Sequence, residues 1–291
     1  MTTDIITTHF DYHSIDHNLL KLDILGLSTA TKVKELRDST NTKFSYDLFE
    51  DDDTIDGFRK DGTFDIFQFE SQSACDIARR IKINSFEDIV AATSLNRPGP
   101  LSLGLDKVYE AAKDNPDEST PWYKYTQNTY GVLIYQEQGM DICKKLGNLN
   151  SEVTDKLVKT DLNHISSEQK DEWGKAFHEG CKSNGISDED AEKMFSSLLC
   201  YSFNRGHGIA YAMLSTELMY YKTHFPLQFW LTTLKYEQNE TKMFTHKSNA
   251  VKDGVVFLLP HVNQTAGVSL REIDGEQAIQ EGKIPMPAKP M

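Results

Sequence analysis

The chain has 291 residues, of which 38% are hydrophobic, and this is enough for one or two domains with a real core. No apolar run approaches the ~20 residues that span a bilayer, and the start lacks a signal peptide's basic and apolar segments, so we expect a cytoplasmic protein with no membrane partner. The net charge of −13 argues against nucleic-acid binding, although much of the acid lies in two local runs, 47–56 and 188–192.

The first element in chain order is a short strand at 19–25. Apolar and polar side chains alternate there, which predicts one buried and one polar face, and Gly26 ends the strand. Lys21 and Asp23 are two residues apart and project from the same face, about 7 Å apart. Such a carboxylate can ligate Mg²⁺ beside a lysine that holds a phosphate, and an ordinary exposed ion pair would give the same pattern.

The chain beyond this strand is predicted to be mainly helical. Apolar periodicity, caps and breakers predict helices at 28–37, 73–81, 84–95, 135–146, 188–199 and 208–224, one that opens at Ser166 and ends before Gly185, and another that starts at Pro226. A strand is expected at 255–259, followed by a loose, proline-rich tail at 283–291. Four widely spaced cysteines form no C-x-x-C pair, which indicates reduced, packed thiols. The fold class is therefore mainly α, with a little β-structure at both ends.

Two further segments could bind an anion. The sequence Arg-Pro-Gly-Pro at 97–100 predicts a rigid turn that would hold the Arg97 guanidinium for a phosphate, or a plain helix stop. Residues 203–208 place Arg205 and His207 before a long helix, which is typical of an anion site or of a polar loop between helices. Residues 135–138 start a helix and are expected to lie on a solvated face.

Several motifs, taken in order, resemble one known family. They lie at 20–26, 67–71, 86–89, 97–101, 129–138, 184–186 and 203–207. Together they resemble the C-family DNA polymerases, the alpha subunits of bacterial DNA polymerase III, from about residue 5 to residue 282. The resemblance implies a palm remnant at 1–27, a helical fingers domain at 28–262, and at 263–291 the start of a linker toward a helix-hairpin-helix domain.

The resemblance also implies a role for each candidate residue. Asp23 matches a palm aspartate that ligates a metal, and Lys21 matches the palm lysine near the primer phosphate. The residues expected at the incoming nucleotide are Arg97, Lys159, Arg205 and His207, and those expected at the DNA are Tyr135, Gln136 and Gln138. The family reaction joins a dNTP to a primer 3′-hydroxyl with two Mg²⁺ ions.

Departures from the family pattern lead to two hypotheses. Two further palm aspartates and the thumb have no match in these residues, and the basic stretch expected near Lys159 is reduced and carries Asp161. Under the first hypothesis, a second chain supplies the remaining palm and thumb, with primer–template DNA, dNTP and, through that chain, a sliding clamp as partners. Under the second, the protein is a polymerase remnant, or a DNA- or nucleotide-binding module, without catalysis. In either case the chain alone is expected to be inactive.

Overall fold

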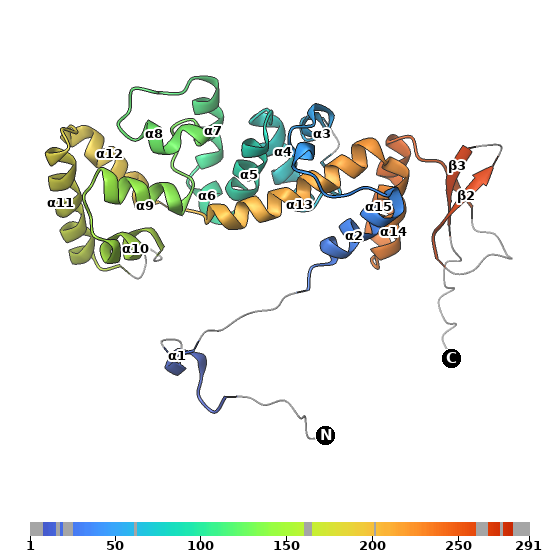
Figure 1. Cartoon of the computed structure of the whole chain (residues 1–291), viewed down its shortest axis with the longest axis horizontal. Coiled ribbons are helices and arrows are strands. Elements are labelled where there is room, and N and C mark those ends of the chain that lie inside the picture. Colours follow the sequence, from blue (N-terminus) through green and yellow to red (C-terminus); the bar gives the residue numbers. More distant parts are fainter. Residues whose placement is uncertain are drawn as a thin grey trace.

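A computed structural model describes residues 8–15, 18–19, 26–60, 63–159, 165–200, 202–259, 267–273 and 276–281. The mainly α prediction is confirmed, because helices and a small sheet make up the described chain (Figure 1). The predicted strand at 19–25, with Lys21 and Asp23, falls outside the described residues except for residue 19. Within the described part, no helix is long and apolar enough to cross a membrane.

The first half of the fold consists of short helices. These are α1 (Tyr12–Ile15), α2 (Ser28–Thr40), the 3₁₀ turn η1 (Tyr46–Phe49), α3 (Asp52–Gly57), α4 (Gln72–Arg80), α5 (Phe86–Leu95), α6 (Pro98–Ser102), α7 (Leu105–Asp114), α8 (Tyr123–Thr126) and the 3₁₀ turn η2 (Gln127–Thr129). The second half has longer helices: α9 (Gln136–Lys145), α10 (Ser151–Lys159), α11 (Ser167–Ser183), α12 (Asp188–Leu198), α13 (Arg205–His224), α14 (Pro226–Tyr236) and α15 (Glu240–Lys252).

Local sequence signals account for most of these boundaries. Ser166 and Gln169 form the predicted capping box at the start of α11, with reciprocal bonds between side chain and backbone. Pro226 lies in the first turn of α14, where its missing N–H has no helical partner to lose. The segment after Arg97 differs from the prediction of a simple turn, because Pro98 starts the short helix α6. Arg97 is therefore the residue before a helix, with extended backbone.

Buried side chains form two separate cores, which define two lobes. The larger lobe contains α2–α7 and α13–α15, and the long helix α13 runs along it and packs against α2, α3 and α5 (Figure 1). The smaller lobe contains α9–α12, and its core includes Trp173 and Phe177 of α11 and the apolar stripe of α12, with Met194 and Phe195. The three buried cysteines, Cys75, Cys143 and Cys181, are free thiols.

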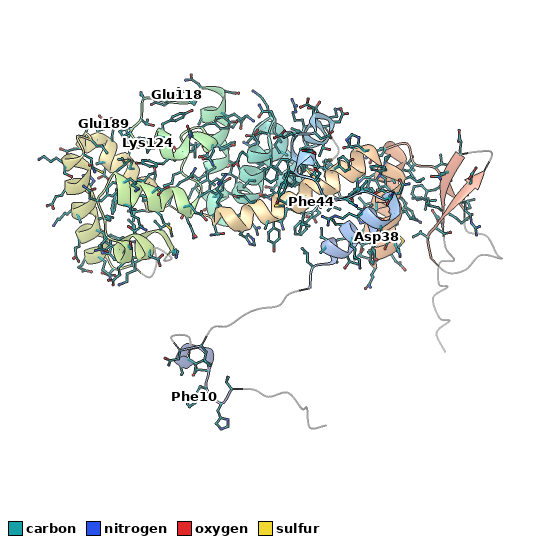
Figure 2. All side chains as sticks on the ribbon, viewed as in Figure 1. Phe10, Asp38, Phe44, Glu118, Lys124 and Glu189 are labelled. Carbon is teal, nitrogen blue, oxygen red and sulfur yellow. The ribbon has the colours of Figure 1, made fainter. Side chains whose placement is uncertain are left out.

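Charged side chains cover the surface of both lobes. Figure 2 labels Glu118, Lys124 and Glu189, all of them exposed, toward the end of the molecule that contains the smaller lobe. In the larger lobe, the guanidinium of Arg37 lies 5.4 Å from the ring centre of Phe44, which is also labelled. The mixture of both signs means that the net charge of −13 does not describe every part of the surface.

A three-stranded sheet ends the described chain. Strand β1 (Phe257–Leu258) lies within the predicted strand and pairs in parallel with β3 (Glu276–Gln280), which pairs antiparallel with β2 (Ser269–Ile273). Ile279 is fully buried and joins the core of the larger lobe. Strands β2 and β3 lie in the segment 263–291, for which the sequence indicated only a linker.

Candidate functional site

Two chain segments connect the lobes and lie side by side. Tyr135 and Phe203 form an isolated parallel β-bridge. The Phe203 N–H donates to the Ile134 carbonyl at 2.8 Å, and the Gln136 N–H donates to the Phe203 carbonyl at 2.9 Å. We call residues 134–136 and 202–204 the inter-lobe bridge. It places the start of α13, in the larger lobe, beside the start of α9, in the smaller lobe.

The first turn of α13 presents backbone N–H groups at this junction. Asn204 caps the helix by accepting a hydrogen bond from the His207 N–H at 2.8 Å. The Glu137 carboxylate accepts from the Arg205 N–H at 3.0 Å and from the Asn204 amide at 3.1 Å. A helix N-terminus attracts negative charge through its free N–H groups and its dipole. A carboxylate of the protein itself therefore stands where an anionic ligand would bind.

Arg205 joins helix α13 to helix α5. Its guanidinium donates to the Glu87 carboxylate at 2.7 Å and lies 5.9 Å from the centre of the Tyr135 ring. The side chains of Arg205 and Glu87 are only about one third exposed, at 33% and 39%. The guanidinium is thus held by a carboxylate on one side and an aromatic ring on the other, with part of its surface open to solvent.

Arg97 approaches the same helix end from the other side. Its guanidinium donates to the Gln68 side chain at 3.2 Å and lies 5.3 Å from the centre of the Phe203 ring. His207 packs against the rings of Phe203 and Tyr211. Burial lowers the pKa of His207, and the positive charge of Arg97 lowers it further. Arg97 and His207 are therefore electrostatic neighbours, although they are 110 positions apart in the sequence.

The loop that carries Gln68 is held in an uncommon conformation. Gln68 has a φ of +68°, a region that residues other than glycine rarely adopt. The loop is fixed to α13, because the Phe67 ring stacks on Tyr211 at 5.2 Å and the Ser215 hydroxyl donates to the Phe67 carbonyl at 2.7 Å. Backbone strain of this kind is often found at functional sites, where the surrounding structure enforces it.

Close helix packing fixes the position of this site. A Cβ atom at Gly208 would lie 2.9 Å from the Ser94 hydroxyl and 3.3 Å from a Val90 methyl group, so only glycine lets α13 approach α5 this closely. The approach brings Glu87, in the first turn of α5, to the start of α13. Rigid placement of this kind suits groups that must meet a ligand in a fixed geometry.

Unpaired polar atoms gather at this place. Among the described residues, five buried side-chain N or O atoms lack a hydrogen-bond partner, and three of them are Nε of Arg97, Nε of Arg205 and Oε2 of Glu87. Buried polar atoms in folded proteins are nearly always paired, so a concentration of unpaired ones calls for an explanation. We name the group formed by Glu87, Arg97, Glu137, Arg205 and His207 the α13 cluster.

The other candidate residues have different surroundings. Lys159 lies in the last turn of α10 and pairs with Asp155 on the same helix at 2.5 Å, outside the α13 cluster. The neighbouring Val158 carbonyl accepts a hydrogen bond from Ser202, which places the end of α10 near the inter-lobe bridge. Gln136 is partly exposed at the start of α9.

The expected solvated face at 135–138 is wrong for two side chains. Tyr135 is fully buried and Gln138 is 5% exposed. Gln138 accepts from the Tyr135 N–H at 2.9 Å and donates to the Thr129 hydroxyl at 2.7 Å and to Asn128 at 3.2 Å, so its hydrogen-bonding groups are used inside the protein. In this conformation neither side chain offers a surface to DNA. Their contacts instead hold the segment that leads into the inter-lobe bridge.

Sequence reasoning missed the acidic members of the α13 cluster. Glu87 and Glu137 lie within motifs that were noted, but an acidic residue in the first turn of a helix is common and gives no sign of a distant cation. Gln68 and Phe203 were likewise noted only as parts of motifs. The sequence contains one signal, which is the number of carboxylates close to the arginines predicted to bind an anion. Such a surplus indicates that some of these carboxylates pair with the arginines.

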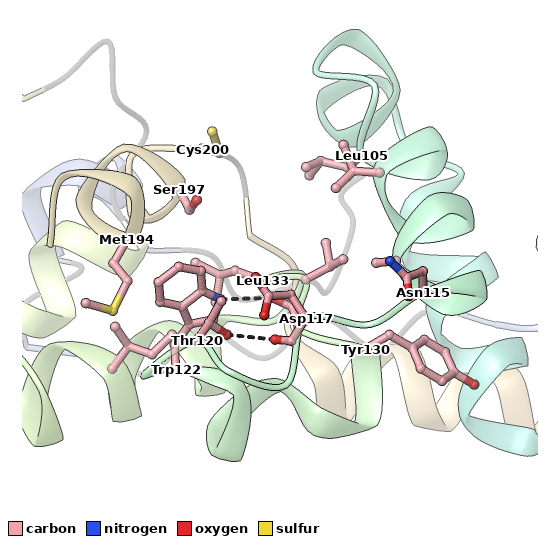
Figure 3. A pocket seen from close by; sticks show the side chains of 15 residues that line it. Leu105, Asn115, Asp117, Thr120, Trp122, Tyr130, Leu133, Met194, Ser197 and Cys200 are labelled. Carbon is pink, nitrogen blue, oxygen red and sulfur yellow. Dashed lines mark hydrogen bonds between the residues drawn. The ribbon is translucent and has the colours of Figure 1, made fainter. Parts of the chain in front are cut away.

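A separate cavity of about 320 Å³ lies between the lobes (Figure 3). Mainly apolar side chains from α7, α9 and α12 line it, together with the loop that contains Trp122. The Trp122 indole donates to the Gly131 carbonyl at 3.1 Å, and the Thr120 hydroxyl donates to the Asp117 carbonyl at 3.1 Å. These bonds shape the wall of the cavity, which contains no candidate residue predicted from the sequence.

Comparisons with known proteins identify the class to which this chain belongs. A family profile described as "Bacterial DNA polymerase III alpha subunit finger domain" matches residues 27–185, which is more than half of the chain. The chain therefore belongs to this family, as the motifs had indicated.

Individual relatives agree with this assignment. The chain is 29% identical over 280 residues to the DNA polymerase III subunit alpha of Haemophilus influenzae, covering 88% of this chain and 24% of that protein. It is 30% identical over 295 residues to the subunit of the same name from Aquifex aeolicus, covering 95% and 25%. The Streptococcus pyogenes subunit is 29% identical over 298 residues, covering 98% and 28%. The chain thus spans about a quarter of the length of these relatives.

Proposed function

We propose that this chain provides the fingers of a template-directed DNA polymerase, and that Arg97, Arg205 and His207 hold the triphosphate of the incoming dNTP. The observation that carries the proposal is their convergence. Groups from two distant segments meet at the N-terminal end of a helix of 20 residues, and Nε of both arginines lacks a partner among the described residues.

The chemistry of phosphoryl transfer suits this arrangement. Catalysis depends mainly on positioning and on neutralising the negative charge of the phosphates. Arginine offers a planar set of donors that matches phosphate oxygens, and the start of α13 adds backbone N–H groups and a partial positive charge. The lowered pKa of His207 keeps its imidazole neutral near pH 7, so it would donate a hydrogen bond rather than a charge.

The remaining machinery belongs to the palm. We assign the metal-ligating role to Asp23 and the primer-phosphate role to Lys21, and we assign the other palm carboxylates and the thumb to polypeptide beyond these 291 residues. Bound Mg²⁺ ions would activate the primer hydroxyl and neutralise the phosphates. In the described part of the chain, no three His, Cys, Asp or Glu side chains form a metal site, so no step is assigned to a metal there.

Primer–template DNA is the proposed macromolecular partner. Gln136, which is partly exposed in the inter-lobe bridge, is its candidate contact in this conformation. Lys159, exposed at the end of α10 near this bridge, keeps its proposed role at the incoming nucleotide. Tyr135 and Gln138 would act indirectly, by holding the segment 127–136 in place. A sliding clamp would associate through the remaining polymerase.

Nucleotide binding by the purified chain tests the proposal. Arg97→Ala and Arg205→Ala should each weaken dATP binding by about 10- to 100-fold, because each removes charge-assisted hydrogen bonds to phosphate. Arg59→Ala is the matched control, since Arg59 is exposed just after α3 and pairs with Asp56 of that helix. Isothermal titration at low salt measures the affinities of the three variants and the parent. Equal affinities for all three variants and the parent would refute the assignment.

One observation favours a second function, a nucleotide- or DNA-binding module without catalysis. Glu87 pairs with the Arg205 guanidinium, Glu137 accepts from the Arg205 backbone N–H, and the chain carries a net charge of −13. Primer extension separates the two functions when a polypeptide that carries the missing palm aspartates is added. Activity that disappears with Asp23→Asn supports the polymerase. Extension that persists with Asp23→Asn contradicts the role of Asp23, and extension by the purified chain alone contradicts the need for a partner.

A further inference from the structure

Glu137 belongs to one lobe but makes its hydrogen bonds with the other. It lies in the first turn of α9, and its carboxylate accepts from the Arg205 N–H at 3.0 Å and the Asn204 side chain at 3.1 Å, at the start of α13. Glu87 holds the Arg205 guanidinium at 2.7 Å. The Arg205 backbone N–H and its Nη2 therefore each have a carboxylate partner already, while its Nε has no partner among the described residues.

The two carboxylates differ in how firmly they are held. Glu87 is only partly exposed, and its Oε2 atom is buried in the larger lobe, where Arg205 is also anchored. Glu137 is exposed on the surface of the smaller lobe, and both its oxygens bond only to groups at the start of α13 among the described residues. An exposed glutamate can move into solvent at little cost, because water replaces the hydrogen bonds that it loses.

We propose that Glu137 is an internal competitor, whose carboxylate occupies the phosphate position at the start of α13 and leaves when the triphosphate binds. This inference rests on the proposed function, since it concerns the same nucleotide site. A carboxylate and a phosphate oxygen require the same donors, so they cannot both bond the Arg205 N–H in its present direction. Occupancy of the site by nucleotide thus removes a contact between the lobes.

The competition has a consequence for selectivity. A ligand must supply more negative charge than one carboxylate to displace Glu137, which a triphosphate does and a nucleoside does not. Glu137 would therefore keep the start of α13 paired in the absence of nucleotide and reject weakly charged ligands. Glu137 would be a positioning residue. It would set how much negative charge a ligand needs in order to bind, and it would not contact the reacting atoms.

Glu137→Gln tests the proposal because it keeps the size of the side chain and removes its charge. The two donors now bond to different carboxylate oxygens, and the amide has an NH2 group in place of one of them, so one of the two bonds is lost in the present geometry. Competition predicts that dATP and inorganic tripolyphosphate each bind about tenfold more tightly to this variant than to the parent. Deoxyadenosine affinity should not change. A merely structural role predicts weaker binding, since the start of α13 would lose a partner.

Asp141→Asn is the matched control, because Asp141 is exposed on the same helix and its substitution also removes one negative charge. It should bind dATP as the parent does. A tenfold gain in both variants would show a general charge effect and overturn the proposal. Glu137→Ala, checked for folding by circular dichroism, should show the same gain as Glu137→Gln.

The outcomes also separate this inference from the proposed function. Binding by the parent that requires Arg97 but is unchanged or weakened in Glu137→Gln would overturn the competition and leave the nucleotide site in place. If neither the parent nor Glu137→Gln binds dATP more tightly than Arg97→Ala does, the proposed nucleotide site is wrong. The proposed role of Glu137 as a competitor is then wrong as well.

Discussion

Asp88, in helix α5, is fully buried and accepts hydrogen bonds from four groups. The donors are the Lys113 ammonium at 2.5 Å, the Tyr109 hydroxyl at 2.8 Å, the Asn84 N–H at 2.9 Å and the Tyr130 hydroxyl at 3.3 Å. These bonds join α5 to α7 and to the segment that leads to the inter-lobe bridge. Replacing Asp88 with Asn would remove the negative charge and leave the 9%-exposed Lys113 side chain without its counter-charge.

The expected loss can be worked out from these contacts. Breaking a buried ion pair by removing one partner costs about 3–5 kcal/mol. Lys113 also donates to the Lys82 carbonyl and to the Asn84 side chain, so some of its hydrogen bonds survive. We therefore expect the lower end of the range, a decrease of about 3 kcal/mol in the free energy of unfolding.

Urea unfolding followed by circular dichroism measures this change. Asp114→Asn is the matched control, because Asp114 pairs with Lys82 on the surface, where the two side chains are 62% and 66% exposed. An exposed pair contributes less than about 1 kcal/mol. The double variant Asp88→Asn with Lys113→Met should recover part of the loss, since it removes the unpaired ammonium. Equal losses for Asp88→Asn and Asp114→Asn would refute the reasoning.

Two further predictions concern packing and pH. A Cβ at Gly180 would lie 1.9 Å from the Gly147 carbonyl oxygen, which is a backbone atom, so Gly180→Ala should lower the free energy of unfolding by about 3 kcal/mol. An unchanged urea midpoint would contradict this packing. Burial lowers the pKa of His246, but Asp65 and Glu237 outweigh burial and raise the pKa above its ordinary value. The resulting stabilisation is complete below about pH 6.5, the ordinary pKa, and is lost as the pH rises through the folded-state pKa. His246→Gln should flatten this part of the pH–stability curve, and a curve of unchanged shape would exclude His246 as its source.

Local signals in the sequence determined most of the helices. The capping box at Ser166, the proline at 226 and the apolar face of 188–199 act over one or two turns, and the structure has helices at each place. The strands β2 and β3 escaped prediction because they are short and carry many polar side chains, which gives a weak strand pattern. They are neighbours in the chain and pair with each other, whereas the pairing of β3 with β1 joins segments that are further apart and is not visible in a local pattern.

The candidate site was predictable in part. Arg97, Arg205 and His207 were chosen from separate motifs, and the structure brings them to one helix end. Residue type alone could not show that Tyr135 and Gln138 face inward, since their burial follows from the packing of the segment 127–135 against α5.

The sequence by itself determined the family, about half of the helices and the cationic residues, because motifs and caps are properties of neighbouring residues, whereas α7, α10 and α15 were not predicted. Only the tertiary structure decided which charges meet. Glu87 and Arg205 are 118 positions apart, and Glu137 and Arg205 are 68 positions apart, yet all three lie at the start of α13. That meeting depends on the close crossing of α5 and α13 at Gly208 and on the inter-lobe bridge, and both arise from contacts between segments that are remote in the chain.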